Sequence, residues 1–392
     1  MKGYVFIGNS TKPTVTQQES LDDVKLTYVS LLPIQCASEH GYKLFAGINR
    51  TYAEKLRCLD NLDIHFYNQH TYRSIFALRD NWVAFKNLRS LLKKHPEIEF
   101  IHCNTPIGGL IGRICGKIYG VKTIVYTAHG FHFYKGAPFF NRTIIKWIER
   151  LLAYWTDAIL TMNKEDFESA SKFCLRNGGK VYHIPGVGVD SNGFTGVDFN
   201  KEYIRDSLNI PQDSVMAIAM GDVVPRKNYK IAIEAVAKAN RSQLHYVICG
   251  KGDQIEILRK YAKELHIEDQ IHFLGFRNDI KELALSSDLF LFSSLQEGLP
   301  RSTMEAMCAG LPCVISEIRG HVDLIENEHG GLLCPVNDVE AFAASLQRMV
   351  DNPDFRKEQG SIAKERIKKF DVEIVRTRLR EIYADILSNS KN

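Results

Sequence analysis

Short apolar runs rich in β-branched residues alternate along the chain with longer stretches whose apolar positions recur at helical spacing. In the first half these runs predict strands at 4–8, 42–46, 98–101, 123–126, 158–161 and 181–183. Helical spacing occurs at 75–94, 109–119 and 142–153. This alternation is typical of a parallel sheet covered by helices, so the pattern predicts an α/β fold.

The same alternation restarts in the second half of the chain. Strands are predicted at 215–221, 244–250, 271–274, 289–293 and 313–316, and helices at 229–239, 254–265, 303–309, 339–350 and 372–387. Two series predict two doubly wound, Rossmann-like parallel-sheet domains, an N-terminal one at 1–187 and a C-terminal one at 188–373. The last helix, at about 374–392, is expected to cross back to the first domain. The glycine-rich segment 185–196 marks the seam, where a deep ligand cleft is expected.

Length and composition agree with two soluble domains. The chain has 392 residues, of which 45% are hydrophobic and 24% charged. Its length exceeds the roughly 250–300 residues beyond which single cores stop growing, so two domains are expected. Its nine cysteines are scattered without C-x-x-C spacing, so neither a disulfide framework nor a zinc site is predicted. The start of the chain does not look like a signal peptide and no 18-residue apolar run occurs. A cytoplasmic protein is therefore expected.

Charge is distributed unevenly between the two halves. The formal net charge of +4 combines +8 over residues 1–190 with −4 over residues 191–392, and residues 70–150 alone carry +9. Such a local excess predicts an anionic partner for the first domain. Nucleic acid is disfavoured as that partner, because the segment contains no recognised nucleic-acid-binding motif.

The segment 293–310 carries the most informative chemistry. A predicted strand ends at its start, a Gly-Leu-Pro turn follows, and a helix begins near Arg301. The first amides of that helix, at Arg301, Ser302 and Thr303, would be available to hold a phosphate. Glu297 and Glu305 are separated by seven residues and could both accept from sugar hydroxyls. Taken alone, this glutamate spacing is more typical of a solvated surface loop.

Two further loops follow predicted strands of the second domain. Arg226 and Lys227 stand in a Pro-Arg-Lys-Asn turn after the first of these strands, where they could reach an anion at the carboxyl edge of the sheet. Gly250 begins a Gly-Lys-Gly-Asp loop after the next strand. Each feature by itself is weak, since basic turns are usually solvated and a lone Gly-x-Gly is an ordinary tight turn.

Together these motifs resemble the donor half of glycosyltransferase family 4, which has the GT-B fold. In the first half, IHCNTPIGG at 101–109, YTAHGFHFYKGAP at 126–138 and NKED at 163–166 are similar to bacterial transferases that build capsular and exopolysaccharide repeat units. The resemblance extends from about residue 25 to the end of the chain. One departure is Asp222, which stands where many members of the family carry arginine.

The resemblance implies roles for individual residues. Arg226 and Lys227 would neutralise the diphosphate of a nucleotide sugar, assisted by the amides near Ser302 and Thr303. Glu305 would bind the ribose hydroxyls, while Glu297 and the backbone of Gly298 and Leu299 would hold the donor sugar. His129, placed directly after a predicted strand, would project toward the transferred sugar; for His132 a functional and a structural role stay equally open.

The resemblance also implies a reaction. We expect a retaining, metal-independent transferase that needs no cofactor beyond its nucleotide-sugar donor, a UDP-sugar, and that acts on a polyprenyl-diphosphate-linked saccharide. A front-face transfer is preferred, since no carboxylate is identified for a double displacement. Two alternatives remain open: a UDP-sugar epimerase of the same fold, and a non-catalytic nucleotide-sugar-binding subunit of a polysaccharide assembly complex.

Residues 131–155 combine many aromatic side chains with Lys135, Arg142, Lys146 and Arg150. This combination suits peripheral contact with an anionic membrane. The opposing interpretation is equally open, because Ile144, Ile145, Ile148, Leu151, Leu152 and Trp155 have the spacing of a buried helix face.

Overall fold

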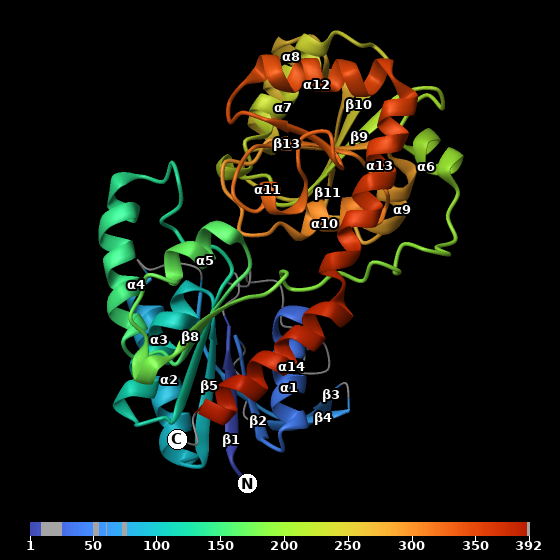
Figure 1. Ribbon diagram of the computed structural model, residues 1–392. Coiled ribbons are helices and arrows are strands. Elements are labelled where there is room, and N and C mark those ends of the chain that lie inside the picture. The colour runs from blue at the N-terminus through green and yellow to red at the C-terminus, as the bar shows by residue number, and fades with distance from the viewer. Residues whose placement is uncertain (9–25, 50–54, 60, 73–76, 390–392) are drawn as a thin grey trace. The chain divides into compact units, whose positions relative to one another are not determined.

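The computed structural model describes residues 1–8, 26–49, 55–59, 61–72 and 77–389, and it divides into two compact units (Figure 1). Unit 1 contains Met1–Gly188 and Glu373–Asn392, and unit 2 contains Val189–Val372. Each unit is an α/β domain built on its own sheet of parallel strands, with one antiparallel edge strand in unit 1. The predicted fold class is confirmed.

Unit 1 has an eight-stranded sheet in the order β3-β4-β2-β1-β5-β6-β7-β8. All neighbouring strands are parallel except β3, which pairs antiparallel with β4 at the edge. The strands are β1 Gly3–Ile7, β2 Lys43–Ile48, β3 Lys55–Leu59, β4 Leu62–Asn68, β5 Ile98–Asn104, β6 Thr123–Ala128, β7 Ala158–Thr161 and β8 Lys180–His183. The central strands are buried on both faces and are therefore mostly apolar.

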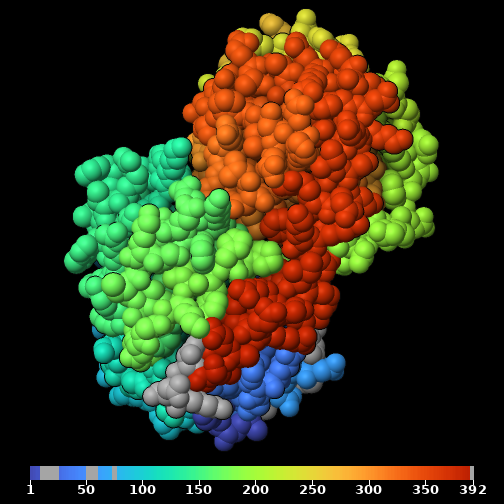
Figure 2. All heavy atoms as spheres, viewed as in Figure 1, coloured from blue at the N-terminus to red at the C-terminus, as the bar shows by residue number. Residues whose placement is uncertain are grey.

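Helices cover both faces of this sheet (Figure 1). They are α1 Tyr28–Glu39, α2 Leu78–Lys94, α3 Pro106–Ile118, η2 Asn141–Ile145, α4 Lys146–Ala153, α5 Lys164–Ala170, the short turn η3 Arg176–Gly178 and α14 Val372–Asn389. The C-terminal helix α14 lies beside α1, red against blue in Figure 2, and Arg380 Nε donates to Glu39 Oε2 at 2.7 Å. The last helix of the chain thus packs in the same unit as the first strand.

Unit 2 has a six-stranded parallel sheet in the order β11-β10-β9-β12-β13-β14. Its strands are β9 Val215–Met220, β10 Leu244–Cys249, β11 Ile271–Gly275, β12 Leu289–Phe292, β13 Cys313–Ser316 and β14 Gly331–Cys334. Numbered from β9, this is the order 3-2-1-4-5-6, in which the direction of winding reverses between the first and fourth strands. Ligands of such sheets bind at that reversal, outside the carboxyl ends of the strands.

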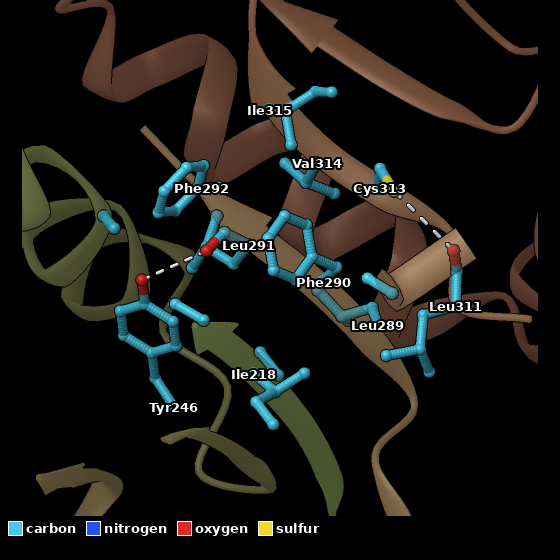
Figure 3. Close-up of a cluster of buried hydrophobic side chains, with 14 of the residues drawn as sticks. Ile218, Tyr246, Leu289, Phe290, Leu291, Phe292, Leu311, Cys313, Val314 and Ile315 are labelled. Atoms are coloured by element: carbon cyan, nitrogen blue, oxygen red, sulfur yellow. Dashed lines mark hydrogen bonds between the residues drawn. The ribbon is translucent and has the colours of Figure 1, made fainter. Parts of the chain in front are cut away.

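Helices flank this sheet, and several of the longer ones are amphipathic. The helices of unit 2 are α6 Lys201–Ser207, η4 Pro225–Lys227, α7 Tyr229–Ala239, α8 Ile255–Glu264, η5 Glu268–Gln270, α9 Ile280–Ser286, α10 Arg301–Cys308, α11 His321–Leu324, α12 Val339–Asp351, α13 Pro353–Ile367 and η6 Lys368–Phe370. Figure 3 shows the centre of the core, where Ile218, Phe290 and Val314 from three adjacent strands lie together and are fully buried. Tyr246 donates its hydroxyl to the Leu291 carbonyl at 3.1 Å, which satisfies the one polar atom this side chain brings into the core.

Candidate functional site

The loops that follow β9 and β12 meet at the winding reversal of unit 2. The first runs from Gly221 through the turn η4 to Asn228, which adopts a left-handed conformation before α7 begins. The second runs from Ser293 to Pro300, where α10 begins. The Leu295 amide donates to the Arg226 carbonyl at 2.9 Å, and Ser293 Oγ donates to the Asn228 carbonyl at 2.7 Å. These bonds fix the two loops against each other.

An ion pair stands at the centre of these loops. Lys227 Nζ donates to Glu297 Oε1 at 2.5 Å, and Ser294 Oγ donates to the same oxygen at 2.8 Å. The Lys227 ammonium also lies 4.6 Å from the centre of the Phe292 ring, a cation–π contact. Both charged side chains are nearly buried. The structure therefore brings together two residues that the motifs predicted in separate loops.

Lys227 and Glu297 each favour the charged form of the other. Burial lowers the pKa of the Lys227 ammonium, and Glu297 opposes that shift. Burial alone would raise the pKa of Glu297, but the neighbouring Lys227 and the Ser294 hydroxyl bring it below the ordinary value of 4.5. Glu297 is consequently a carboxylate at neutral pH and can accept hydrogen bonds.

Two other predicted donor-site residues, Arg226 and Glu305, are more exposed than the ion pair. Arg226 keeps its side chain 46% exposed, with its guanidinium 3.7 Å from Glu297 Oε1. In α10, Arg301 Nε donates to Glu305 Oε1 at 2.8 Å, one helical turn apart. The first intrahelical bond of α10 runs from the Met304 amide to the Pro300 carbonyl, so the amides of Arg301, Ser302 and Thr303 precede the helical ladder.

Gly250 has a packing role that its motif did not reveal. The Gly221 amide donates to the Cys249 carbonyl at 2.9 Å, and a Cβ at Gly250 would collide with the Gly221 carbonyl. The Gly-Lys-Gly-Asp loop thus lies directly on the loop that carries Arg226 and Lys227. Whether Gly250 also touches the donor stays a prediction.

Sequence reasoning missed a third supporting loop, formed by Arg319, Gly320 and His321 after β13. Arg319 Nε donates to the Glu297 carbonyl at 3.1 Å, and a Cβ at Gly320, whose φ is +83°, would strike the Gly298 carbonyl. His321 is fully buried and donates from Nδ1 to the Ser316 carbonyl at 2.8 Å. The available signal was a glycine in the short loop that follows the predicted strand 313–316. This loop holds the backbone on which Glu297, Gly298 and Leu299 sit.

In unit 1, His129 directly follows β6 and is half-buried. The loop after it is held by Asp166, a buried carboxylate that accepts from the Phe131 amide at 3.1 Å and from Asn163 Nδ2 at 2.8 Å. Asn163 also caps α5 by accepting from the Asp166 amide at 2.8 Å. The NKED motif is therefore a clamp on the loop that carries His129, whereas His132 on the same loop is exposed.

The segment after this loop presents apolar side chains to solvent. Ile144 and Leu151 were expected in a buried stripe, but both are exposed, together with Phe139, Phe140, Trp147 and Tyr154. Leu152 is buried and Ile145, Ile148 and Trp155 are half-buried, so the expectation was right for one face of the helix only. One side of the helix packs on α3, where Glu149 pairs with Arg113, and the opposite side remains apolar and exposed.

The fold and these motifs define a class of protein. Residues 200–366 match the family described as "Glycosyl transferases group 1", and residues 38–163 match the one described as "Glycosyl transferase 4-like". The protein EpsD of Bacillus subtilis (strain 168) is 31% identical over 314 residues, covering 79% of this chain and 81% of EpsD. The chain belongs to glycosyltransferase family 4, with the GT-B fold.

A second relative matches almost end to end. The UDP-Gal:alpha-D-GlcNAc-diphosphoundecaprenol alpha-1,3-galactosyltransferase of Escherichia coli is 27% identical over 383 residues, covering 93% of this chain and 98% of that protein. Among solved structures, HepE of Anabaena in complex with UDP-glucose superposes with a TM-score of 0.75 at 19% identity, covering 98% of this chain and all of HepE. WaaG, described as a glycosyltransferase involved in lipopolysaccharide biosynthesis, gives a TM-score of 0.70 at 16% identity, covering 97% and 99%.

Proposed function

We propose that this glycosyltransferase moves a hexosyl or N-acetylhexosaminyl group from a UDP-sugar to a saccharide carried on a polyprenyl diphosphate, in the synthesis of a surface polysaccharide. The observation that carries the proposal is the Lys227–Glu297 pair at the winding reversal of unit 2, with Arg226 and the first amides of α10 beside it. Cations and helix amides suit a diphosphate, and an ionised glutamate suits sugar hydroxyls. The names of the two relatives with stated ligands, one acting on UDP-Gal and one crystallised with UDP-glucose, support the same donor class.

In this proposal unit 2 does the work that a metal ion performs in other transferases. Arg226, Lys227 and the amides of Ser302 and Thr303 stabilise the departing diphosphate. Glu297 and the backbone of Gly298 and Leu299 hold the donor sugar, and Glu305 holds the ribose. His129 belongs to the acceptor-side machinery of unit 1. The sugar is transferred from the front face with retention of its anomeric configuration.

We also infer that unit 1 contacts an anionic membrane through residues 131–155, because the acceptor is lipid-linked. The exposed residues Phe140, Ile144, Trp147, Leu151 and Tyr154 are spaced by four, three, four and three positions, so they follow one face of the helix. None of the helices within the described ranges has the length and apolar character of a membrane span.

The charges around this apolar face support the same partner. Glu149 is the one acidic residue of the segment, and it is turned inward onto the buried Arg113 at 2.8 Å. The cations Lys135, Arg142 and Arg150 remain exposed. Each cation near an anionic membrane contributes about 1 kcal/mol.

A panel of UDP-sugars and GDP-sugars, each offered with and without undecaprenyl-diphosphate-linked N-acetylglucosamine, tests the proposed reaction. We expect UDP release and an elongated lipid only when one UDP-sugar and the acceptor are both present, with the same rate in excess EDTA. NMR of the product should show the anomeric configuration of the donor. An altered sugar formed without acceptor would identify an epimerase instead, and donor binding without turnover would identify a binding subunit.

A further inference from the structure

Behind His129, unit 1 contains a continuous chain of buried polar side chains. The Tyr4 hydroxyl of β1 lies 3.0 Å from the Tyr383 hydroxyl of α14. The Tyr383 hydroxyl lies 2.6 Å from His102 Nδ1, and His102 Nε2 lies 2.7 Å from Thr127 Oγ1 of β6. All four residues are buried. Elements from both ends of the sequence are thus joined by hydrogen bonds through the sheet.

This series of hydrogen-bonded side chains ends beside His129, the predicted acceptor-side histidine. Thr127 and His129 are two residues apart and line the same cavity, whose other described walls are apolar side chains of α1, α14 and the segments after β7 and β8. Burial, together with a smaller effect of the nearby His129, lowers the pKa of His102 to about 3. His102 is therefore neutral under ordinary conditions, and it is close enough to interact electrostatically with His129.

A neutral imidazole has one N–H, which gives the chain a direction. In one arrangement the tyrosine hydroxyls donate toward His102 Nδ1, Nε2 donates to Thr127, and the Thr127 hydroxyl is left to donate into the cavity. In the other arrangement Thr127 donates to Nε2 and offers only its lone pairs to the cavity. The state of His102 thus decides what Thr127 presents beside His129.

We propose that His102 is a positioning residue for the acceptor side of the reaction: Tyr383 of the C-terminal helix fixes its ring, and His102 in turn fixes the Thr127 hydroxyl beside His129. This inference rests on the proposed transferase function. If so, the C-terminal helix α14 determines whether the Thr127 hydroxyl of β6 donates or accepts a hydrogen bond beside His129.

Matched variants separate positioning from simple support of the fold. Tyr383→Phe and Thr127→Val each remove one hydroxyl of the chain and keep the shape of the side chain. Tyr182→Phe is the control, because the Tyr182 hydroxyl donates to Asp385 of the same helix at 2.6 Å but stands outside the chain. We expect Tyr383→Phe and Thr127→Val to lower kcat about tenfold, with the Kd for UDP unchanged, while Tyr182→Phe retains kcat.

Substitutions of His102 test which of its two ring nitrogens is needed for positioning Thr127. Glutamine can place a polar group near the position of Nε2, whereas asparagine mimics Nδ1. His102→Gln should therefore preserve more turnover than His102→Asn. Wild-type turnover in Tyr383→Phe and Thr127→Val, or an equal loss in Tyr182→Phe, would overturn the proposal.

One readout does not depend on turnover. In protein labelled with ¹⁵N at its histidine rings, the ring signals of His129 should shift in Tyr383→Phe and stay in place in Tyr182→Phe. Unchanged His129 signals in both variants would defeat the positioning role. If the wild-type protein transfers no sugar while these signals do shift, then the proposed function fails and the coupling through His102 stands.

Discussion

Lys227 and Glu297 are seventy residues apart in the sequence, and their side chains form a hydrogen-bonded ion pair of 2.5 Å. The pair joins the loops after the first and fourth strands of unit 2, the two strands between which the winding reverses. Because Lys227 is nearly buried and bonded to Glu297, its charge is already partly neutralised. Arg226, about half exposed, is the cation with greater freedom to reach a ligand.

Replacing Glu297 should separate catalysis from nucleotide binding. Glu297→Gln keeps the size of the side chain and a partner for Ser294, but it removes the negative charge that faces Lys227. We expect transfer to fall at least about a hundredfold, since a misplaced donor sugar loses alignment with the acceptor. UDP binding by calorimetry should remain measurable, because Arg226, Lys227 and the first amides of α10 are all retained. Undiminished turnover would contradict the assigned role.

The two neighbouring cations should respond differently to substitution. Arg226→Ala is expected to raise the Kd for UDP about 10- to 100-fold, with little change in melting temperature, because a charged hydrogen bond is lost at an exposed position. Lys227→Met leaves Glu297 buried without its partner, so it should destabilise the protein by about 3–5 kcal/mol. Calorimetric titration and thermal denaturation measure the two effects.

A nearby lysine provides the control for this pair of variants. Lys230 is exposed on α7, three residues beyond Lys227, and Lys230→Ala should change neither binding nor stability. If Arg226→Ala bound UDP like the wild-type protein, the assignment of Arg226 to the diphosphate would be wrong.

Much of the fold could be predicted because its strands are short, buried and apolar on both faces. The bounds of β7 and β13 agree with the predicted 158–161 and 313–316 to the residue. The sequence pattern missed α13, since its buried positions include Gln359, Gly360 and Ala363 rather than an apolar stripe. Gly360 is required there because a Cβ would collide with the Gly310 carbonyl. Helix α1 was missed as well, and Pro33 lies inside it.

From local patterns alone the candidate site was predictable only as separate parts, and the family resemblance was what assigned those parts to one donor. Strand ends and turn glycines located Lys227 and Glu297, but nothing local in the sequence states that two loops seventy residues apart will meet. The clamp at Asp166 and the network through His102 depend in the same way on pairing between distant strands. Contacts between side chains of distant segments follow from the order of the strands in the sheet. The hydrophobic periodicity of a single segment does not predict them.

Asp166 should control the acceptor side without affecting the donor side. Asp166→Ala removes the acceptor of the Phe131 amide, so the loop that carries His129 loses its buried anchor. We expect kcat to fall at least tenfold while the Kd for UDP stays unchanged. Glu165→Ala is the matched control, because Glu165 also accepts from this loop, at the Lys135 amide, but does so at the surface. Equal effects of the two substitutions would argue against a special role for Asp166.

Acid should destabilise unit 2 through His321. Burial lowers the pKa of this imidazole from 6.5 to about 4. Between pH 6.5 and pH 4 the imidazole is therefore protonated in the unfolded chain and neutral in the folded protein. The contribution of His321 to the free energy of unfolding is therefore fully present above pH 6.5. It is lost as the pH drops toward 4, by about 1.4 kcal/mol per pH unit.

A histidine replacement can isolate this contribution. His321→Asn can keep the hydrogen bond to the Ser316 carbonyl without a titrating group. The free energy of urea unfolding, measured at pH 7 and pH 5, should fall less in the variant than in the wild-type protein. An identical fall in both would show that His321 does not titrate as its burial implies.

The exposed apolar face of residues 140–154 should decide whether the enzyme associates with membranes. Wild-type protein is expected to float with vesicles that contain phosphatidylglycerol and to remain unbound with purely zwitterionic vesicles, because both apolar insertion and cationic attraction are needed. Raising the salt to about 0.5 M should weaken the association by screening the cations.

Trp147, 62% exposed at the centre of the face, contributes the largest apolar area. Trp147→Ser should therefore abolish flotation, whereas Tyr203→Ser, which removes a still more exposed aromatic side chain from unit 2, should leave it intact. Flotation of Trp147→Ser at the wild-type level would show that this face is not the contact, and absence of wild-type flotation at low salt would exclude the anionic membrane as its partner.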